Sequence, residues 1–198
     1  MIICIEGCIG VGKTSLTKKL SAALGGESIY EEFENNPFLK DFYENPDQFG
    51  FHVQSTFLFL QSKQFMNATE LAKKNNVFAD FHPVKSKIFS SIVIKNKTEQ
   101  DIIQKIYDRL FSNLDSKTLI VYLQASPEII LERIKLRGDK FTSGISRDYI
   151  ESVTKSYESF FENYKNPMIS IDTNNLDFEK NNNNWLLIKK IIEDKMKD

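Results

Sequence analysis

The sequence predicts an α/β fold in which a five-stranded parallel sheet is flanked by helices. Three observations lead to this prediction. Short β-type runs alternate with longer segments of helical periodicity, a pattern typical of parallel strands joined by crossover helices. The first apolar run leads directly into a glycine-rich loop that opens a helix. No linker or internal repeat interrupts the alternation, so we expect one domain over residues 1–198. The strands are expected at residues 2–6, 28–30, 76–80, 118–123 and 168–171.

The loop after the first strand is predicted to bind phosphate. Its sequence, GCIGVGKTSL at residues 7–16, fits the pattern G-x-x-x-x-G-K-[ST]. Gly7, Gly10 and Gly12 allow the backbone to curl so that its N–H groups point at an anion. The apolar spacing of the following residues predicts a helix, whose N-terminus adds unpaired N–H groups and a favourable dipole.

The side chains of this loop specify which anion it binds. The pattern predicts that Lys13 reaches the β- and γ-phosphates of a nucleoside triphosphate and that the Thr14 hydroxyl holds Mg²⁺. Ser15, at the start of the helix, is assigned to the same nucleotide site. The predicted fold is therefore a three-layer P-loop fold, with the nucleotide at the carboxyl end of the first strand.

Two glutamates follow the second strand. Glu31 and Glu32 stand where open parallel sheets bind their ligands, and a carboxylate there can accept a proton from an attacking hydroxyl group. Successive side chains alternate in extended chain, so only one of the two is expected to face the phosphates, and Glu31 is the candidate. An ordinary acidic loop is the alternative interpretation.

Several helix starts are marked in the sequence. One long helix is expected from residue 47 to about residue 74, and another near 84–94. Ser126, followed by proline and glutamate, predicts a helix start, and Thr98 with Asp101 resembles a capping box. The segment 92–99 also mimics the guanine-reading signature of GTPases, but it carries Glu99 where that signature needs aspartate.

Composition argues against several classes of protein. The formal net charge is −1 and no basic cluster stands out, so a nucleic-acid-binding surface is not expected. The two cysteines, Cys4 and Cys8, indicate neither a disulfide framework nor a zinc site. No apolar run approaches the length of a membrane span, and the N-terminal apolar run is too short for a signal peptide. We therefore expect a cytoplasmic protein that does not bind membranes.

The motifs together resemble the deoxyribonucleoside kinases, especially their bacterial branch, over nearly the whole chain. The similar stretches are IEGCIGVGKTSL, EEFENNPFLKDFYENPDQFGFHVQ, KIF at 87–89, VYLQASPEIILERIKLRGDK, GISRDYIE and IDTNNLDF. The resemblance implies ATP-dependent phosphorylation of a deoxynucleoside 5′-hydroxyl. It also implies a lid at about residues 137–146 that closes over ATP, and a homodimer joined through a helix bundle.

The resemblance assigns roles to individual residues. On the acceptor side, Glu31 matches the general base, Tyr43 a residue that binds the sugar 3′-hydroxyl, and Gln54 the residue that reads the base edge. Asp80 is placed with the nucleoside site, where it assists Mg²⁺ or caps the next turn of chain. On the donor side, the matched residues are the lid arginines Arg133 and Arg137 and the adenine-loop residues Asp177 and Phe178.

Some positions depart from the family pattern. Asp80 stands where the family often has the arginine of an acid–arginine pair, and Gln61 replaces another arginine. The remaining departures are Lys85 or Ser86 at an acidic base-reading position, Asp139 or Lys140 at a second lid arginine, and Thr142 at a sugar-binding glutamate. The sequence therefore does not predict the preferred base.

Two alternative functions remain open at this point. A nucleoside monophosphate kinase shares the loop and the lid arginines, but it needs arginines near the acceptor, and residues 34–65 contain none. A non-catalytic nucleotide-binding subunit is suggested by the altered lid and by Gln61. The intact set of Lys13, Thr14 and Glu31 argues against this second alternative.

Overall fold

The computed structural model describes residues 1–112, 114, 118–138 and 144–197. Five strands form one sheet in the order β2-β3-β1-β4-β5, and each neighbouring pair is parallel. The strands are β1 (Ile2–Gly7), β2 (Glu27–Ile29), β3 (Val77–Ala79), β4 (Thr118–Gln124) and β5 (Met168–Asp172). The predicted five-stranded parallel sheet is confirmed, and each predicted strand end lies within one residue of the observed one.

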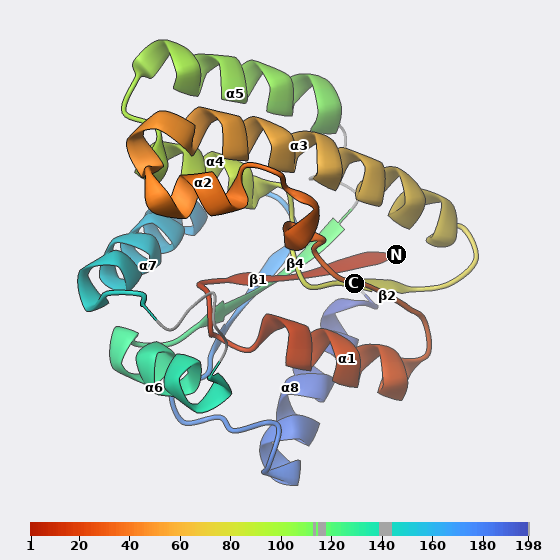
Figure 1. The fold of residues 1–198 in the computed structure, drawn as a ribbon. Helices are drawn as coiled ribbons and strands as arrows, with labels where there is room; N and C mark the ends of the chain where they lie inside the picture. The colour runs from red at the N-terminus through yellow and green to blue at the C-terminus, as the bar shows by residue number, and fades with distance from the viewer. Residues whose placement is uncertain (113, 115–117, 139–143, 198) are drawn as a thin grey trace.

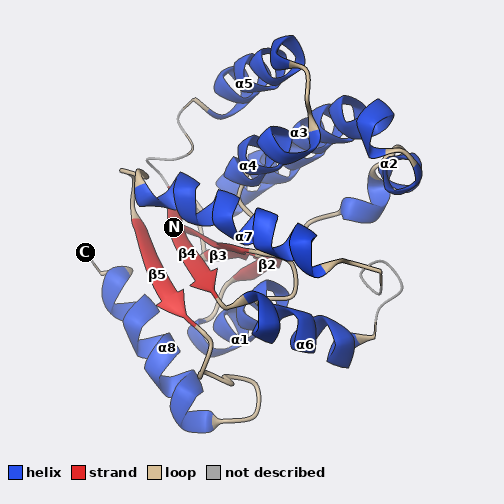
Figure 2. Cartoon of the chain, turned by 90° about the vertical axis from the view of Figure 1, so that its left-hand side faces the viewer, coloured by secondary structure: helices blue, strands red, loops and turns tan. Residues whose placement is uncertain are grey.

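Helices cover both faces of the sheet (Figure 1). The described helices are α1 (Lys13–Leu24), α2 (Leu39–Glu44), α3 (Pro46–Leu71), α4 (Val84–Val93), α5 (Lys97–Phe111), α6 (Pro127–Arg137), α7 (Arg147–Glu162) and α8 (Asn182–Lys195), with a short 3₁₀ turn at Phe33–Asn35. Helices α1 and α8 lie on one side of the sheet, and α4 and α7 lie on the other, where α3 and α5 pack on α4. Figure 2 shows α7 and α8 on opposite sides of β4 and β5. The three-layer prediction is confirmed.

The start of α5 corrects one sequence prediction. The capping box at Thr98 is wrong, because α5 begins at Lys97 and its N-cap is Asn96. The Asn96 side chain accepts hydrogen bonds from the N–H groups of Thr98 (2.9 Å) and Glu99 (3.3 Å). Thr98 is already helical, so its own N–H is one of the groups that need a cap. The asparagine of the GTPase-like segment thus has a capping function.

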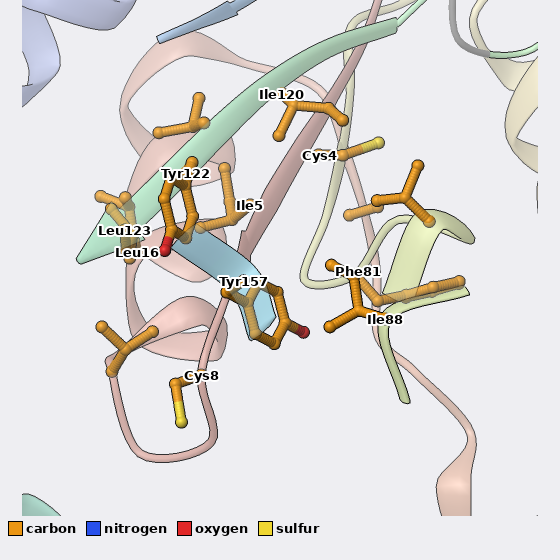
Figure 3. Close-up of a cluster of buried hydrophobic side chains, with 14 of the residues drawn as sticks. Cys4, Ile5, Cys8, Leu16, Phe81, Ile88, Ile120, Tyr122, Leu123 and Tyr157 are labelled. Atoms are coloured by element: carbon orange, nitrogen blue, oxygen red, sulfur yellow. The ribbon is translucent and has the colours of Figure 1, made fainter. Parts of the chain in front are cut away.

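The hydrophobic core surrounds the base of the glycine-rich loop (Figure 3). Cys8 of the loop, Leu16 of α1, Ile88 of α4 and Tyr157 of α7 come from four different segments and all are buried in this cluster. The Tyr157 ring stacks on Tyr122 of β4 with 6.1 Å between ring centroids. Dense packing of this kind resists displacement, so the core fixes the loop against the sheet.

A buried carboxylate connects three parts of this region. Glu6, at the end of β1, is inaccessible to solvent and accepts hydrogen bonds from Gly7 N (2.9 Å), Tyr157 OH (2.9 Å) and His82 N (2.8 Å). Burial raises the pKa of Glu6, and the charge of Lys13 opposes that rise. The carboxylate thereby ties the glycine-rich loop, α7 and the β3–α4 connection to one point.

Helices α3 and α4 approach closely at Gly50. A Cβ atom on Gly50 would lie 2.7 Å from the carbonyl oxygen of Val93, so a larger residue would push the two helices apart. This contact sets α3 close beside α4. Among the described helices, none has both the length and the hydropathy that a membrane span requires.

Candidate active site

The carboxyl ends of three neighbouring strands bring the predicted residues together. The glycine-rich loop follows β1, Glu31 follows β2 and Asp80 follows β3, and β3 lies between the other two strands. Parallel strands end at the same edge of a sheet, so segments far apart in sequence converge there. From β1 the chain crosses to β2 on one side of the sheet, whereas from β3 it crosses to β4 on the other side of β1. Open α/β sheets bind ligands at the carboxyl ends of the strands where the connections change direction in this way.

The glycine-rich loop has the geometry of an anion cradle. Gly7, Gly10 and Gly12 all adopt positive φ angles, of 144°, 80° and 109°. Gly12 is the N-cap of α1 and offers no side chain to the first N–H groups of the helix, which leaves them for an anion. The Lys13 ammonium donates to the carbonyl oxygens of Gly7 (2.8 Å) and Cys8 (3.1 Å), and burial lowers its pKa. Ser15 lies in the first turn of α1.

Asp80 joins the loop to the segment that carries Glu31. The Thr14 hydroxyl donates to one carboxylate oxygen of Asp80 at 2.6 Å, and the Glu31 backbone N–H donates to the other at 2.8 Å. Asp80 therefore fixes the chain after β2, rather than the turn that follows β3. A hydroxyl and a carboxylate in contact are oxygen ligands of the kind that Mg²⁺ prefers.

The carboxylate of Glu31 is held by two donors. Gln61 of α3 donates to Oε1 at 2.9 Å, and Lys85 of α4 donates to Oε2 and forms an ion pair with it. Burial alone would raise the pKa of Glu31, but the charge and hydrogen bond of Lys85, together with Gln61, hold it below its usual range. The Glu31 charge likewise holds the Lys85 pKa above its usual range, against the effect of burial. Glu31 is thus ionised at neutral pH.

Glu32 has a different environment. Its side chain is exposed and accepts a hydrogen bond from Asn35 at 2.7 Å. Glu31 therefore faces the interior and Glu32 faces solvent, as expected. The chain at Glu32 is not extended, however, because this residue has φ −82° and ψ 57° where it caps the short 3₁₀ turn.

Tyr43 lies on α2, and Gln54 lies on α3, the helix that also carries the Glu31 partner Gln61. Gln54 of α3 is buried, whereas Tyr43 of α2 is 52% exposed. Asn36 lies just before α2 and ties this part of the chain to α3, because its side-chain amide donates to the Val53 carbonyl at 2.9 Å. Burial, with a smaller effect of the Tyr43 phenol, raises the pKa of Tyr149 to about 12, so the start of α7 lies near α2.

Arg133 connects the back of the glycine-rich loop to the end of β5. Its guanidinium donates to the Val11 carbonyl (3.2 Å) and to the hydroxyl (3.0 Å) and carbonyl (2.7 Å) of Thr173. Arg137 is the exposed last residue of α6. The core of the predicted lid, residues 139–143 with Asp139, Lys140 and Thr142, lies outside the described residues.

The predicted adenine loop packs on α1 and on the glycine-rich loop. Phe178 is buried, and its ring would meet a Cβ atom on Gly12 at 3.0 Å. Lys19 of α1 donates to the Phe178 carbonyl at 2.5 Å, and Asp177 accepts from the backbone N–H groups of Glu179 and Lys180. Asp177 and Phe178 thus shape the loop next to the cradle.

Three contacts of this site were not predicted from the sequence. The sequence marks Lys85 and Gln61 only as departures from the family pattern, and it gives Glu6 no role. Gln61 lies seven residues after Gln54 and so on the same face of α3, which is a periodicity signal for a shared site. Glu6 is a charged residue at the end of a buried apolar strand. A buried charge requires hydrogen-bonding partners, so this position could have been recognised from the sequence as a point where several segments meet.

Comparison with known proteins agrees with this geometry. The family model "Deoxynucleoside kinase" matches residues 3–196. The chain is 32% identical to a deoxyguanosine kinase of Bacillus subtilis over 190 residues, covering 92% of this chain and 91% of that protein. It is 28% identical to a deoxyadenosine kinase of Lactobacillus acidophilus, and the match covers 100% of this chain and 97% of that protein.

Solved structures give the same result for the fold. A deoxyadenosine kinase from M. mycoides with bound dATP superposes with a TM-score of 0.82 and 26% identity, covering 98% of this chain and 99% of that one. The same enzyme with bound dCTP superposes with a TM-score of 0.80, and the match covers 98% of this chain and 100% of that one.

Proposed function

The chain belongs to the deoxynucleoside kinase family, and from this premise we propose how its residues phosphorylate the 5′-hydroxyl of a deoxynucleoside. The family's reaction is ATP-dependent and serves nucleotide salvage. One observation carries the residue assignment: Asp80 links the Thr14 hydroxyl of the phosphate loop to the backbone of Glu31. A P-loop enzyme transfers phosphate to a substrate when a hydroxyl group, rather than water, is oriented at the γ-phosphate.

Glu31 acts as the general base for the 5′-hydroxyl. Each of its carboxylate oxygens accepts one protein hydrogen bond and retains a lone-pair site for the substrate. The ionised state, favoured by Lys85, is the one that accepts a proton.

The donor end uses the loop and its neighbours. Lys13 and the N–H groups of the cradle bind the phosphates of ATP, and the loop at Asp177 and Phe178 borders the adenine. Arg137 lies at the start of the predicted lid and would contribute positive charge to the transferring group, while Arg133 holds the loop.

We assign Mg²⁺ to Thr14 and Asp80. Their oxygens lie 2.6 Å apart and fit a cation that binds few protein ligands and otherwise keeps water and phosphate oxygens. Among the described residues no group of three or more His, Cys, Asp or Glu side chains could hold a metal. Mg²⁺ does not require such a group, because it usually binds through one or two carboxylates together with water and substrate phosphates. When bound, Mg²⁺ neutralises charge on the β- and γ-phosphate oxygens.

The acceptor is a purine deoxynucleoside. Tyr43 binds its 3′-hydroxyl, and the buried amide of Gln54 reads the base edge with one donor and one acceptor group. The relatives reported above are named deoxyguanosine and deoxyadenosine kinases, which supports a purine.

The experiment that tests this function is an acceptor panel. The four deoxynucleosides and the four deoxynucleoside monophosphates are each incubated with ATP, Mg²⁺ and the enzyme, and products are resolved by chromatography. We expect 5′-monophosphates, formed fastest from a purine, and no product from the Lys13→Ala variant. Monophosphates as the better acceptors, or an active Lys13→Ala variant, would reject the proposal.

We also propose a homodimer formed through α3. Phe59 and Met66 lie seven residues apart on one face of this helix and are 57% and 71% exposed. A second copy of the chain would bury this apolar face.

Cys4 and Cys8 are buried thiols, in keeping with a reducing compartment, and the cytoplasm is the location we propose.

A further inference from the structure

Two helices converge on the carboxylate of Glu31, and they supply its two side-chain partners. We infer that Lys85 is a positioning residue, which holds Glu31 in the orientation needed to accept the 5′-hydroxyl proton. This inference rests on the role proposed above for Glu31.

The geometry leaves little freedom for the carboxylate. Gln61 donates to one of its oxygens and Lys85 to the other, so a rotation of the carboxylate breaks at least one contact. The backbone of Glu31 is fixed separately by Asp80. With the main chain and both oxygens restrained, Glu31 has one orientation before any substrate binds, which is the condition for efficient catalysis by a side chain.

The amide of Gln61 is itself oriented. Ser86, the neighbour of Lys85 on α4, donates to Oε1 of Gln61 at 3.1 Å. Because that oxygen is occupied as an acceptor, the NH₂ group of Gln61 faces Glu31 and acts as a donor. Ser86 is buried and Gln61 is 1% exposed, so this relay is shielded from competing water.

Lys85 supplies what Gln61 cannot, a full positive charge at short range. The Lys85 side chain is 23% exposed and that of Glu31 is 12% exposed, so the pair is largely shielded from solvent. A charge-assisted hydrogen bond in such surroundings is stronger than a neutral one. The Lys85 ammonium donates to Glu31 and forms an ion pair with it, so its charge is engaged by the carboxylate. We therefore assign Lys85 to the general base rather than to the nucleobase.

The test combines variants of Lys85 with a variant of Glu31. Lys85→Met removes the charge and keeps the length of the chain, and Lys85→Arg keeps the charge. Both are made in the parent and in the Glu31→Gln background, and kcat and KM are measured with deoxyguanosine or deoxyadenosine and ATP. Lys87→Met is the matched control, because Lys87 lies on the same helix but pairs with Asp108 (3.7 Å) and covers the Tyr107 ring.

Four results are expected if Lys85 positions Glu31. Lys85→Met lowers kcat on the order of 10²-fold, which is the loss expected when a catalytic group is displaced by about 1 Å. The KM values for the nucleoside and for ATP change little. Lys85→Arg restores most of the loss, and Lys87→Met behaves as the parent. In the Glu31→Gln background, Lys85→Met causes no further loss, because the residue it acts through is already disabled.

Several results would overturn the inference. These are an unchanged kcat in Lys85→Met, a loss confined to the nucleoside KM, or an equal further loss in the Glu31→Gln background. The comparison of Glu31→Gln with the Glu31→Gln/Lys85→Met double variant remains decisive even if Lys85→Met alone does not fold. In the double variant, no Glu31 charge is left buried without its partner. A fully active Glu31→Gln enzyme would instead reject the proposed base, and this inference with it. An inactive Glu31→Gln beside a fully active Lys85→Met rejects the inference alone.

Discussion

His82 is held in its neutral form by its hydrogen bonds. Its Nδ1 accepts from the Val84 backbone N–H at 3.2 Å, so Nε2 carries the proton and faces the Thr118 hydroxyl at 3.2 Å. Protonation of Nδ1 would place two donors against each other in a site that solvent does not reach. Burial, with a smaller contribution from the charge of Lys87, lowers the pKa of His82 to about 3.

We predict that His82 makes the fold sensitive to acid. The unfolded chain binds a proton below its pKa of about 6.5, whereas the folded protein does not until about pH 3, so stability is lost as pH falls through this window. Between pH 7 and pH 5 the loss is about 2 kcal/mol. Urea unfolding at the two pH values should show that His82→Gln loses less stability than the parent. Equal losses in both proteins would contradict the assignment.

Single residues differ in how far the sequence predicts them. The different surroundings of Glu31 and Glu32 agree with the prediction made from local alternation, although the chain leaves the extended conformation at Glu32. The pairing of Lys85 with Glu31 was not predictable, because the residues lie 54 positions apart and meet only when α4 and the chain after β2 come together in the fold. Arg133 illustrates the same limit, since its contact with Val11 spans 122 positions.

At the scale of elements, strand positions were predicted best. A fully buried parallel strand is a continuous apolar run, and such runs have clear ends. The long helix was expected to end near residue 74 and ends at Leu71. Helix ends depend on capping contacts that several neighbouring residues could make, so the sequence pattern favours Thr98 although Asn96 is the cap.

The cap of α5 provides a stability test. Asn96→Ala should lower the free energy of unfolding by about 1 kcal/mol, since the N–H groups of Thr98 and Glu99 lose their acceptor. Thr98→Ala is the matched control and should change stability by no more than a few tenths of a kcal/mol. Chemical denaturation of the three proteins measures both effects. The opposite ranking would restore Thr98 as the cap.

At the scale of the whole molecule, sheet order determines the site. Because β3 lies between β1 and β2, Asp80 is placed where it reaches both Thr14 and Glu31. The alternation of strands and helices predicts a parallel sheet but not the order of its strands. That residues 1–198 form one domain stays a prediction.

Assembly is predicted to depend on the exposed face of α3. Phe59→Glu places a charge in the proposed interface and should convert the dimer to a monomer, because an unpaired charge is costly to bury. Leu187→Glu on α8 is the control, with a side chain of similar exposure (50% against 57%) on the other side of the sheet. Sedimentation over a range of concentrations distinguishes the states. A parent that is monomeric at every concentration would contradict the proposed dimer.

The central claim is that Glu31, poised beside the phosphate loop, takes the proton from the 5′-hydroxyl. The most direct measurement compares kcat of Glu31→Gln and Glu32→Gln with a purine deoxynucleoside and ATP. Glutamine keeps the size and hydrogen-bonding capacity of glutamate but removes the basic site, so Glu31→Gln should lose about 10²–10⁴-fold in kcat with little change in ATP affinity. Glu32→Gln should stay within a few-fold of the parent, because its side chain faces solvent. A fully active Glu31→Gln enzyme, or the greater loss in Glu32→Gln, would contradict the account.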